Sequence, residues 1–303
     1  MKKLLLTGAT GFIGSHVLDA LLFRGVYDVH AVTHDTLSPQ RLGVTWHQAD
    51  LLNSVQTDCL MRDLCPDLLM HFAWYAVPGE YWVSNKNLDW AEASIHLIKS
   101  FYAYGGQRIV GAGTCAEYKW GSEILSESAT ALEPATLYGQ SKLKVGELLD
   151  KYAREFDKSS AWGRIFFLYG PYEDPRRLVS SVICSLLGNK PALCTHCQQV
   201  RDFLYVKDVA AAFVALLESD VNGPVNIASG CAVKLQEIVQ IAERCLGMEG
   251  QVKFGELPVA DNECPVIVGD CHRLNFEVGW RPAYSFIAGL TETRDYWREM
   301  RRI

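Results

Sequence analysis

The sequence has no apolar run that approaches the ~18–20 residues of a membrane-spanning helix. Its opening, Met1-Lys2-Lys3 followed by Leu4–Leu6, turns polar at Thr7-Gly8. The apolar stretch is therefore shorter than the ~7–15 residues of a signal-peptide core. These two absences predict a cytoplasmic protein that does not contact a membrane.

An excess of positive charge is also missing. Lysine and arginine total 29 against 35 acidic residues, a net charge of −6, which argues against a nucleic-acid partner because such a protein needs a basic face. Hydrophobic residues make up 49% of the 303, so the chain can bury a full core. No repeat, low-complexity tract or long linker divides it.

The ten cysteines form no disulfide framework. The one tight cluster is Cys194, His196 and Cys197. A closed zinc site needs about four ligands, and no second cluster has matching spacing. We therefore predict no metal and interpret this cluster as part of a surface loop, with a zinc site as the alternative.

Short apolar segments alternate with stretches of helical periodicity, which predicts an α/β fold with a parallel sheet covered on both faces. The predicted strands are Lys3–Thr7, Val29–Thr33, Val44–His47, Leu68–Phe72, Arg108–Ala112 and Ala161–Leu168. The predicted helices are Phe12–Arg24, Leu88–Tyr104, Tyr138–Glu155, Leu178–Leu187, Asp208–Glu218, Leu235–Leu246 and Ser285–Arg298.

The first strand runs into a glycine-rich turn, Thr7–Gly14, with glycines spaced G-x-x-G-x-x-G. Such a turn lets the backbone approach a pyrophosphate, and the following helix offers free N–H groups and a positive dipole end. This pattern predicts a dinucleotide site, although a plain glycine-rich turn is the alternative. The expected contacts are Gly8, Thr10, Gly11, Phe12, Ile13 and Gly14.

The end of the second strand distinguishes NAD from NADP, because an acid there binds the adenosine ribose hydroxyls. The strand ends at Thr33-His34, and Asp35 comes one or two places too late. Thr33 and His34 can donate to a 2′-phosphate, so NADP is favoured, with NAD left open. Asp50 and Leu51 suit a contact with the adenine edge, or else Asp50 caps a helix over Leu51–Arg62.

Tyr138 and Lys142 stand at i and i+4 and so share one helix face. An adjacent ammonium lowers the pKa of a phenol, which makes Tyr138 a candidate proton donor or acceptor. Thr114 follows an apolar strand and can hydrogen-bond the same substrate oxygen. A solvated helix pair is the alternative for Tyr138 and Lys142.

Taken in order, these motifs resemble the extended short-chain dehydrogenase/reductase family of nucleotide-sugar epimerases, dehydratases and reductases. The resemblance covers nearly the whole chain. The matching segments are Thr7–Gly14, His71-Phe72-Ala73, Thr114 with Tyr118, Tyr138 with Lys142, Arg164 before Tyr169-Gly170-Pro171, Arg201–Val206 with Asp208-Val209, Asn226-Ile227, Gly279–Pro282 and Gly289–Trp297.

The resemblance implies a Rossmann-type doubly wound parallel sheet and a smaller mixed α/β substrate lobe at the C-terminal side. The implied NAD(P)-binding domain is 1–167 with about 205–228, and the implied nucleotide-sugar lobe is about 168–204 and 229–303. Tyr138 would be the acid/base, Lys142 would bind the nicotinamide ribose, and Thr114 would take the Ser/Thr position. Cofactor contacts are also implied for Phe72, Ala73 and Trp74, and substrate contacts for Tyr75, Arg177 and Arg201.

Two of these assignments have alternatives. A guanidinium fork suits a diphosphate, but Arg201 could instead pair with its neighbour Asp202. The aromatic segment Trp74–Trp82 could shape a sugar pocket or be a packed loop.

The chain also departs from the family pattern. The acid and base of the 4,6-dehydratases are replaced by Cys115 and Ala116, which argues against dehydration, and Phe167 replaces a frequent asparagine.

The function predicted from the sequence is NADPH-dependent reduction of the 4-keto group of a nucleotide-linked 6-deoxy-4-ketohexose. The alternatives are a 4-epimerase with tightly bound NAD and, ranked low, a non-catalytic NADP-binding sensor. The predicted partners are a nucleotide-diphosphate sugar and a second copy of the chain. That homodimer would form through the helices predicted at Leu88–Tyr104 and Tyr138–Glu155.

Overall fold

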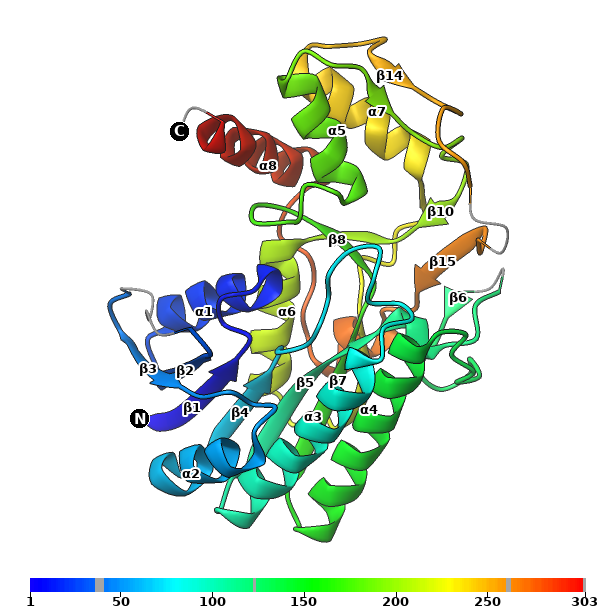
Figure 1. Ribbon diagram of the computed structural model, residues 1–303. Helices are drawn as coiled ribbons and strands as arrows, with labels where there is room; N and C mark the ends of the chain where they lie inside the picture. The colour runs from blue at the N-terminus through cyan, green and yellow to red at the C-terminus, as the bar shows by residue number, and fades with distance from the viewer. Residues whose placement is uncertain (36–40, 122–123, 260–262, 302–303) are drawn as a thin grey trace.

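A seven-stranded parallel sheet forms the base of the computed structural model, which describes residues 1–35, 41–121, 124–259 and 263–301 (Figure 1). The strand order is β12-β7-β5-β4-β1-β2-β3, and every neighbouring pair is parallel. The strands are β1 (Lys2–Thr7), β2 (Tyr27–Thr33), β3 (Val44–Gln48), β4 (Leu68–His71), β5 (Arg108–Thr114), β7 (Ser159–Ile165) and β12 (Gly223–Ile227). The predicted α/β class and Rossmann-type sheet are confirmed.

Helices cover both faces of this sheet. One face packs against α1 (Phe12–Arg24) and α6 (Val206–Glu218), and the other against α2 (Ser54–Leu64), α3 (Lys86–Ala103) and α4 (Leu137–Glu155). The inner strand β5 is buried along its whole length, as expected of a parallel strand covered on both sides. Its carboxyl end therefore holds Thr114 in a fixed position.

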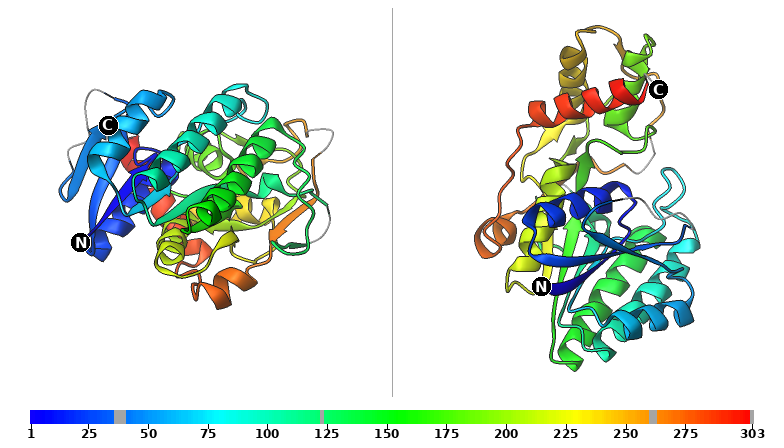
Figure 2. Two further views of the ribbon diagram at one scale, coloured as in Figure 1. Left: turned by 90° about the horizontal axis from the view of Figure 1, so that it is seen from below. Right: turned by 90° about the vertical axis from the view of Figure 1, so that its left-hand side faces the viewer.

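The second lobe lies beyond the carboxyl ends of the strands, as the right-hand view of Figure 2 shows. Its helices are α5 (Leu178–Leu187), α7 (Leu235–Leu246) and α8 (Phe286–Met300), which share one apolar cluster. Its strands form the sheet β13-β10-β15-β6 and the pairs β8-β11 and β9-β14. They are β6 (Ile124–Leu125), β8 (Phe167–Tyr169), β9 (Ala192–Leu193), β10 (Val200–Arg201), β11 (Phe203–Tyr205), β13 (Val233–Lys234), β14 (Val252–Lys253) and β15 (Val266–Gly269).

Most predicted elements match the observed bounds to within two residues, but two differ by more. The strand predicted over Ala161–Leu168 divides at Phe166, whose N–H pairs with the carbonyl of Ile227. The segment β8 then pairs with β11 outside the large sheet. The helix predicted over Leu51–Arg62 begins at Ser54.

The start of α2 is set by Asn53, whose side chain accepts from the N–H groups of Val55 and Gln56. Asp50 instead accepts from the N–H of Leu52 in a turn before the helix, so the proposed cap at Asp50 was wrong. Asp50 and Asn53 are both good capping residues, and only the local turn decides between them.

None of the helices that the structure describes is both long and apolar enough to cross a membrane.

His71 joins three elements at the carboxyl end of β4. The Thr7 hydroxyl accepts the N–H groups of Phe72 and Ala73, so its own proton goes to Nδ1 of His71 at 2.7 Å. The proton of the ring is therefore on Nε2, which lies 2.8 Å from Oγ of Ser94 on α3. Burial, with a smaller effect of Lys142, lowers the pKa of His71 to about 3.

Because the folded-state pKa of His71 lies below the unfolded value, the unfolded chain binds a proton that the folded chain does not. Stability is therefore lost as the pH falls below about 6.5 towards 3. We expect His71→Gln to reduce the loss of unfolding free energy between pH 7 and pH 5 by about 2 kcal/mol relative to the parent protein. Urea unfolding at both pH values measures this difference. An equal pH dependence in the two proteins would contradict it.

Candidate active site

The glycine turn brings β1, the first turn of α1 and the segment after β4 into close contact. Gly8 has φ +69°, and a Cβ there would lie 2.6 Å from the backbone nitrogen of Ala73. A Cβ on Gly14 would lie 2.0 Å from the carbonyl oxygen of Gly8. These two glycines are therefore required by the backbone itself.

Gly11 has a different role. A Cβ on Gly11 would have the Gly8 carbonyl oxygen as its nearest atom, at 3.3 Å, so the outer side of Gly11 is open. Gly11 is the N-cap residue of α1 without a side-chain cap, and the first turn holds no acidic residue. The open backbone, uncapped N–H groups and helix dipole fit the pyrophosphate of a dinucleotide.

Thr114 and Tyr138 meet where β5 ends and α4 begins. The first turn of α4 lies directly on the short 3₁₀ helix η1 (Cys115–Glu117), because a Cβ on Gly139 would be 2.3 Å from the carbonyl oxygen of Ala116. This close approach places the side chain of Tyr138 beside that of Thr114, which acts to lower the pKa of the phenol. The Thr114 hydroxyl oxygen accepts the N–H of Ala116 at 3.2 Å.

Lys142 lies one turn further along α4, and its ammonium group is buried. Its Nζ donates to the carbonyl oxygen of Ala112 at 2.9 Å and lies 3.9 Å from the ring centroid of Trp74. This cation–π contact and the carbonyl replace part of the lost hydration. Burial nevertheless lowers the pKa of Lys142 to about 7, with Glu117 acting in the opposite direction.

The expected lowering of the Tyr138 pKa is not found. Burial, reinforced by Tyr81, raises the pKa of the Tyr138 hydroxyl well above its usual value, and among the larger effects only that of Thr114 opposes the rise. The sequence argument counted the i, i+4 ammonium but not the desolvation of the phenol. Tyr138 is therefore a protonated phenol at neutral pH.

Aromatic rings surround Tyr138. The ring centroids of Tyr81, Trp82 and Trp74 lie 4.8, 5.8 and 6.5 Å from its centroid, all in edge-to-face geometry. The predicted aromatic segment after β4 therefore packs against the Tyr138 ring while also lining a cavity. We call Trp74, Tyr81, Trp82 and Tyr138 the aromatic group.

Arg201 lies at the far side of the same cavity, on β10. Its Nη2 donates to Oε1 of Glu263 at 3.2 Å, its Nη1 donates to the carbonyl oxygen of Val200, and the guanidinium lies over the ring of Phe167. The alternative of an ion pair with Asp202 was wrong. The Asp202 carboxylate accepts instead from the backbone N–H groups of Ser229, Gly230 and Gly269.

One cavity of about 840 Å³ between the two lobes contains most of the predicted residues. Those that line it are Gly8, Gly11, Phe12, Ile13, Gly14, Phe72, Trp74, Tyr75, Thr114, Tyr138, Lys142, Arg177 and Arg201. Thr10, Ala73, Thr33, His34, Asp50 and Leu51 lie outside this lining. The glycine turn, the Tyr138 hydroxyl and Arg201 thus share one space.

β2 ends at Thr33, and Asp35 lies two residues beyond it, as expected from the sequence. His34 is exposed, and its Nε2 lies 3.2 Å from the carboxylate of Asp35. Thr33 is buried, and its hydroxyl oxygen accepts the N–H of Asp35. Both groups proposed to receive a 2′-phosphate therefore contact Asp35.

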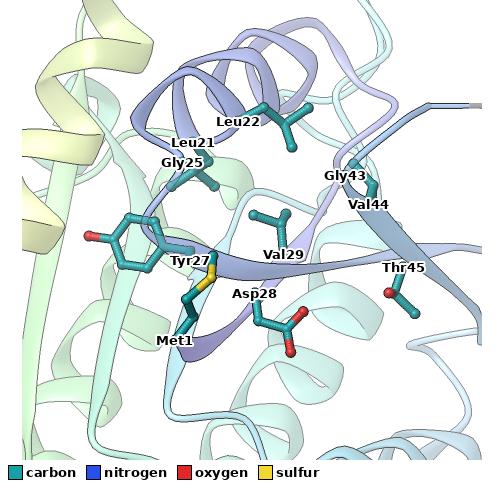
Figure 3. A pocket seen from close by; sticks show the side chains of 10 residues that line it. All are labelled: Met1, Leu21, Leu22, Gly25, Tyr27, Asp28, Val29, Gly43, Val44 and Thr45. Carbon is teal, nitrogen blue, oxygen red and sulfur yellow. The ribbon is translucent and has the colours of Figure 1, made fainter.

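A second cavity and the Cys194–Cys197 loop lie apart from the predicted site residues. A cavity of about 680 Å³ lies at the amino ends of β1, β2 and β3, lined by Met1, Tyr27, Asp28 and others, and no predicted site residue borders it (Figure 3). In the Cys194–Cys197 loop, the His196 ring nitrogen Nδ1 accepts the N–H of Gln198. Among the residues that the structure describes, no three His, Cys, Asp or Glu side chains are placed to hold a metal ion.

Sequence reasoning missed Glu117, Trp120, Glu173, Phe203 and Glu263. Four of them line the cavity, and Glu117 lies behind Thr114. Thr114-x-x-Glu117 is a capping-box spacing and could have been recognised. Burial raises the pKa of Glu173 to about 7, but nothing local in the sequence marks that carboxyl.

The family model described as "NAD dependent epimerase/dehydratase family" matches residues 4–228. A UDP-glucose 4-epimerase from Azospirillum brasilense is 27% identical, over 97% of this chain and 91% of that protein. A dTDP-4-dehydro-6-deoxyglucose reductase from Escherichia coli is 25% identical, over 94% of each chain. Full-length similarity thus extends to two different reactions.

A solved structure gives the same overall shape. The UDP-glucose 4-epimerase of Thermus thermophilus, solved in complex with NAD, superposes with a TM-score of 0.86 at 25% identity, over 98% of this chain and 99% of that one. The two lobes and the cavity between them therefore belong to an arrangement seen in an NAD-binding protein.

The glycine geometry makes a prediction for stability. Gly14→Ala puts a methyl group into the Gly8 carbonyl and should lower the free energy of unfolding by ~3 kcal/mol or more, since neither backbone segment can move freely. In Gly11→Ala the new methyl group contacts only an oxygen at 3.3 Å, so the free energy of unfolding should change by less than about 1 kcal/mol. Thermal and urea unfolding of the two variants compare them directly. Equal effects would refute this account of the turn.

Proposed function

Because the chain belongs to the NAD-dependent epimerase/dehydratase family, we propose that it reduces the 4-keto group of a nucleotide-linked 6-deoxy-4-ketohexose, using NADPH. Residues 1–167 with about 205–228 hold the cofactor in this proposal. Residues about 168–204 and 229–303 hold the nucleotide sugar. A homodimer through α3 and α4 is part of the same proposal.

The observation that carries the proposal is the protonated phenol of Tyr138, which lies beside Thr114 in the cavity between the lobes. Reduction of a ketone needs an acid that delivers a proton to the oxygen as the hydride arrives at carbon. A phenol whose pKa is raised by burial is in the acid form at neutral pH. An enzyme that first oxidises an alcohol needs a base at this position instead.

The surroundings of Tyr138 support a sugar with an apolar substituent at the reacting end. The aromatic group presents ring faces and edges there, and the Trp120 indole N–H is already donated to the Cys115 carbonyl. Apolar C–H groups of a hexose, and a methyl group at C6, pack well on such rings. A 4,6-dehydratase is disfavoured, because burial raises the pKa of the Cys115 thiol to about 12 and Ala116 has no titratable group.

The cofactor site fits a dinucleotide on the basis of the open Gly11 backbone and the uncapped first turn of α1. NADPH is favoured by β2 ending in Thr33 and an exposed His34. Against it stand the Asp35 carboxylate beside His34 and the NAD bound in the Thermus thermophilus structure. The choice is therefore part of the test.

In this mechanism Thr114, Tyr138, Lys142 and Arg201 each act on a stated part of the cofactor or substrate. The nicotinamide, when bound, supplies the hydride. Thr114 donates a hydrogen bond that orients the keto oxygen, and Tyr138 gives that oxygen its proton. Lys142 holds the cofactor ribose and contributes positive charge beside the phenol while it is protonated. Arg201 binds the diphosphate, exchanging its contact with Glu263 for one with the substrate.

A 4-epimerase is the second candidate. It is favoured by the similarity to the Azospirillum brasilense and Thermus thermophilus 4-epimerases. The same residues would serve, with Tyr138 acting first as a base. A non-catalytic sensor ranks below both, because it would not need Tyr138 and Lys142 together in one cavity.

Incubation with a panel of nucleotide-linked 4-keto sugars and either NADPH or NADH tests the proposal. The absorbance of the reduced nicotinamide should fall in step with product formation followed by NMR, with NADPH preferred. Interconversion of an unoxidised nucleotide sugar without added cofactor would establish the epimerase instead. Preference for NADH would reject the cofactor assignment alone.

Tyr138→Phe should keep cofactor affinity and reduce kcat by ~10²–10⁴-fold, because only the proton donor is lost. Lys142→Met should lower both cofactor affinity and kcat, because the ammonium has two tasks. Fluorescence titration with the cofactor and steady-state kinetics separate these effects. Near-native kcat in Tyr138→Phe would remove Tyr138 from the chemistry.

Arg201 and Glu263 should give opposite results. Arg201→Ala should weaken binding of a nucleoside diphosphate by about tenfold or more, since a charge-assisted hydrogen bond contributes roughly 1.5–3 kcal/mol. Glu263→Gln should strengthen it, because a competing carboxylate becomes neutral. Calorimetry with UDP and dTDP measures both. If both variants weaken binding alike, the pair is structural and Arg201 is not the diphosphate ligand.

A further inference from the structure

Glu117 is a carboxylate with no exposed surface, placed directly behind the Thr114–Tyr138 pair. Its Oε1 accepts the backbone N–H of Thr114 at 2.8 Å and the indole N–H of Trp162 at 2.9 Å. Its Oε2 accepts Nε of Arg164 at 2.7 Å. Every oxygen of this anion is therefore engaged, and one bond holds the end of β5.

The sheet makes room for this arrangement with glycine. A Cβ on Gly113 would lie 2.3 Å from Nε1 of Trp162 and 2.7 Å from Oε1 of Glu117. A Cβ on Gly111 would lie 2.4 Å from the same indole ring. Two glycines of β5 thus keep Trp162 and Glu117 against the backbone of this strand, immediately before Thr114.

Lys142 needs a negative charge that its direct contacts do not supply. Within the described part of the chain, no carboxylate lies at ion-pair distance from its Nζ, which contacts the Ala112 carbonyl and the Trp74 ring. The Trp162 ring connects the two charges, since Nζ lies 5.8 Å from its centroid while its N–H donates to Glu117.

The negative charge of Glu117 raises the pKa of Lys142 against the effect of burial. The other titratable groups facing the ammonium cannot replace it. His71 on β4 is held neutral, the Cys115 thiol and the Tyr138 phenol are protonated, and Tyr81 is a buried phenol of raised pKa. None of these carries charge at neutral pH.

We propose that Glu117 is a positioning residue with two functions: it fixes the Thr114 backbone at the end of β5, and its negative charge keeps the buried Lys142 protonated. The charge function is independent of which reaction the chain performs. The consequence for turnover rests on the function proposed above.

The charge function is tested without substrate. The Nζ signal of Lys142 is followed against pH by NMR in protein labelled with ¹⁵N-lysine, and the signal is assigned through Lys142→Met. Glu117→Gln, which keeps an oxygen for the Thr114 N–H but loses the charge, should lower the titration midpoint of Lys142 by about one pH unit. The matched control is Glu243→Gln, a buried carboxyl of the second lobe that also accepts a backbone N–H, and it should leave the midpoint unchanged. An unchanged midpoint in Glu117→Gln, or equal shifts in both variants, overturns the charge function.

The positioning function is tested by Glu117→Asp, which keeps the charge but is one methylene too short for its present contact with Thr114. The Lys142 midpoint should stay near the parent value, while kcat with the accepted substrate falls about tenfold or more and the KM for the cofactor changes less than about threefold. Parent kcat in this variant overturns the positioning function.

Should Glu117→Gln fail to fold because Arg164 is left unpaired, the double variant Glu117→Gln/Arg164→Gln removes both charges, and the lowered midpoint is still expected. If no substrate is turned over by the parent protein, the proposed function fails, while the NMR result still decides the charge function.

Discussion

The ion pair between Glu117 and Arg164 is the interaction on which the geometry of the cavity depends. Arg164 lies on β7 and donates to Glu117 after β5, and its Nη1 donates to the Tyr118 hydroxyl at 3.0 Å. That hydroxyl donates to Asn226 on β12, whose amide reaches the carbonyl oxygens of Leu125 and Asp270 in the second lobe. A pair buried in this way is costly to break from one side, at about 3–5 kcal/mol, because the remaining charge loses its partner. Three strands and the neighbouring lobe are therefore held in one fixed relation.

Desolvation shifts the pKa values of two groups of this site in opposite directions. It favours the neutral form of each, so the phenol of Tyr138 holds its proton more tightly and the ammonium of Lys142 holds its proton less tightly. The two side chains are one helical turn apart and experience the same low-dielectric surroundings. The site therefore combines a neutral acid with a cation that titrates near neutral pH, and a small change in local charge alters the second much more than the first.

What the sequence could predict followed from short-range rules. The glycine turn was recognisable from the local spacing of its glycines, although the contact that requires glycine at Gly8 comes from the distant Ala73. Tyr138 and Lys142 were recognisable because helical spacing puts them on one face. The predicted start of α2 was wrong because two good capping residues, Asp50 and Asn53, lie within four positions. The strand predicted over Ala161–Leu168 was wrong because a continuous apolar run does not show that the Phe166 N–H bonds to the carbonyl of Ile227. Partners such as Glu117 with Trp162, or Arg201 with Glu263, are 45 and 62 residues apart and are fixed only by tertiary structure.

The break at Phe166 makes the chain pass from the large sheet into the second lobe, and it returns through β11 into α6. It leaves again after β12, where Asp202 of the other lobe binds the N–H groups of Ser229 and Gly230. No single cut in the polypeptide therefore separates the two lobes, and neither lobe is a continuous segment that could be exchanged or lost by itself. Recombination at a single point therefore cannot give such a molecule one complete lobe of a relative while it keeps the other lobe intact.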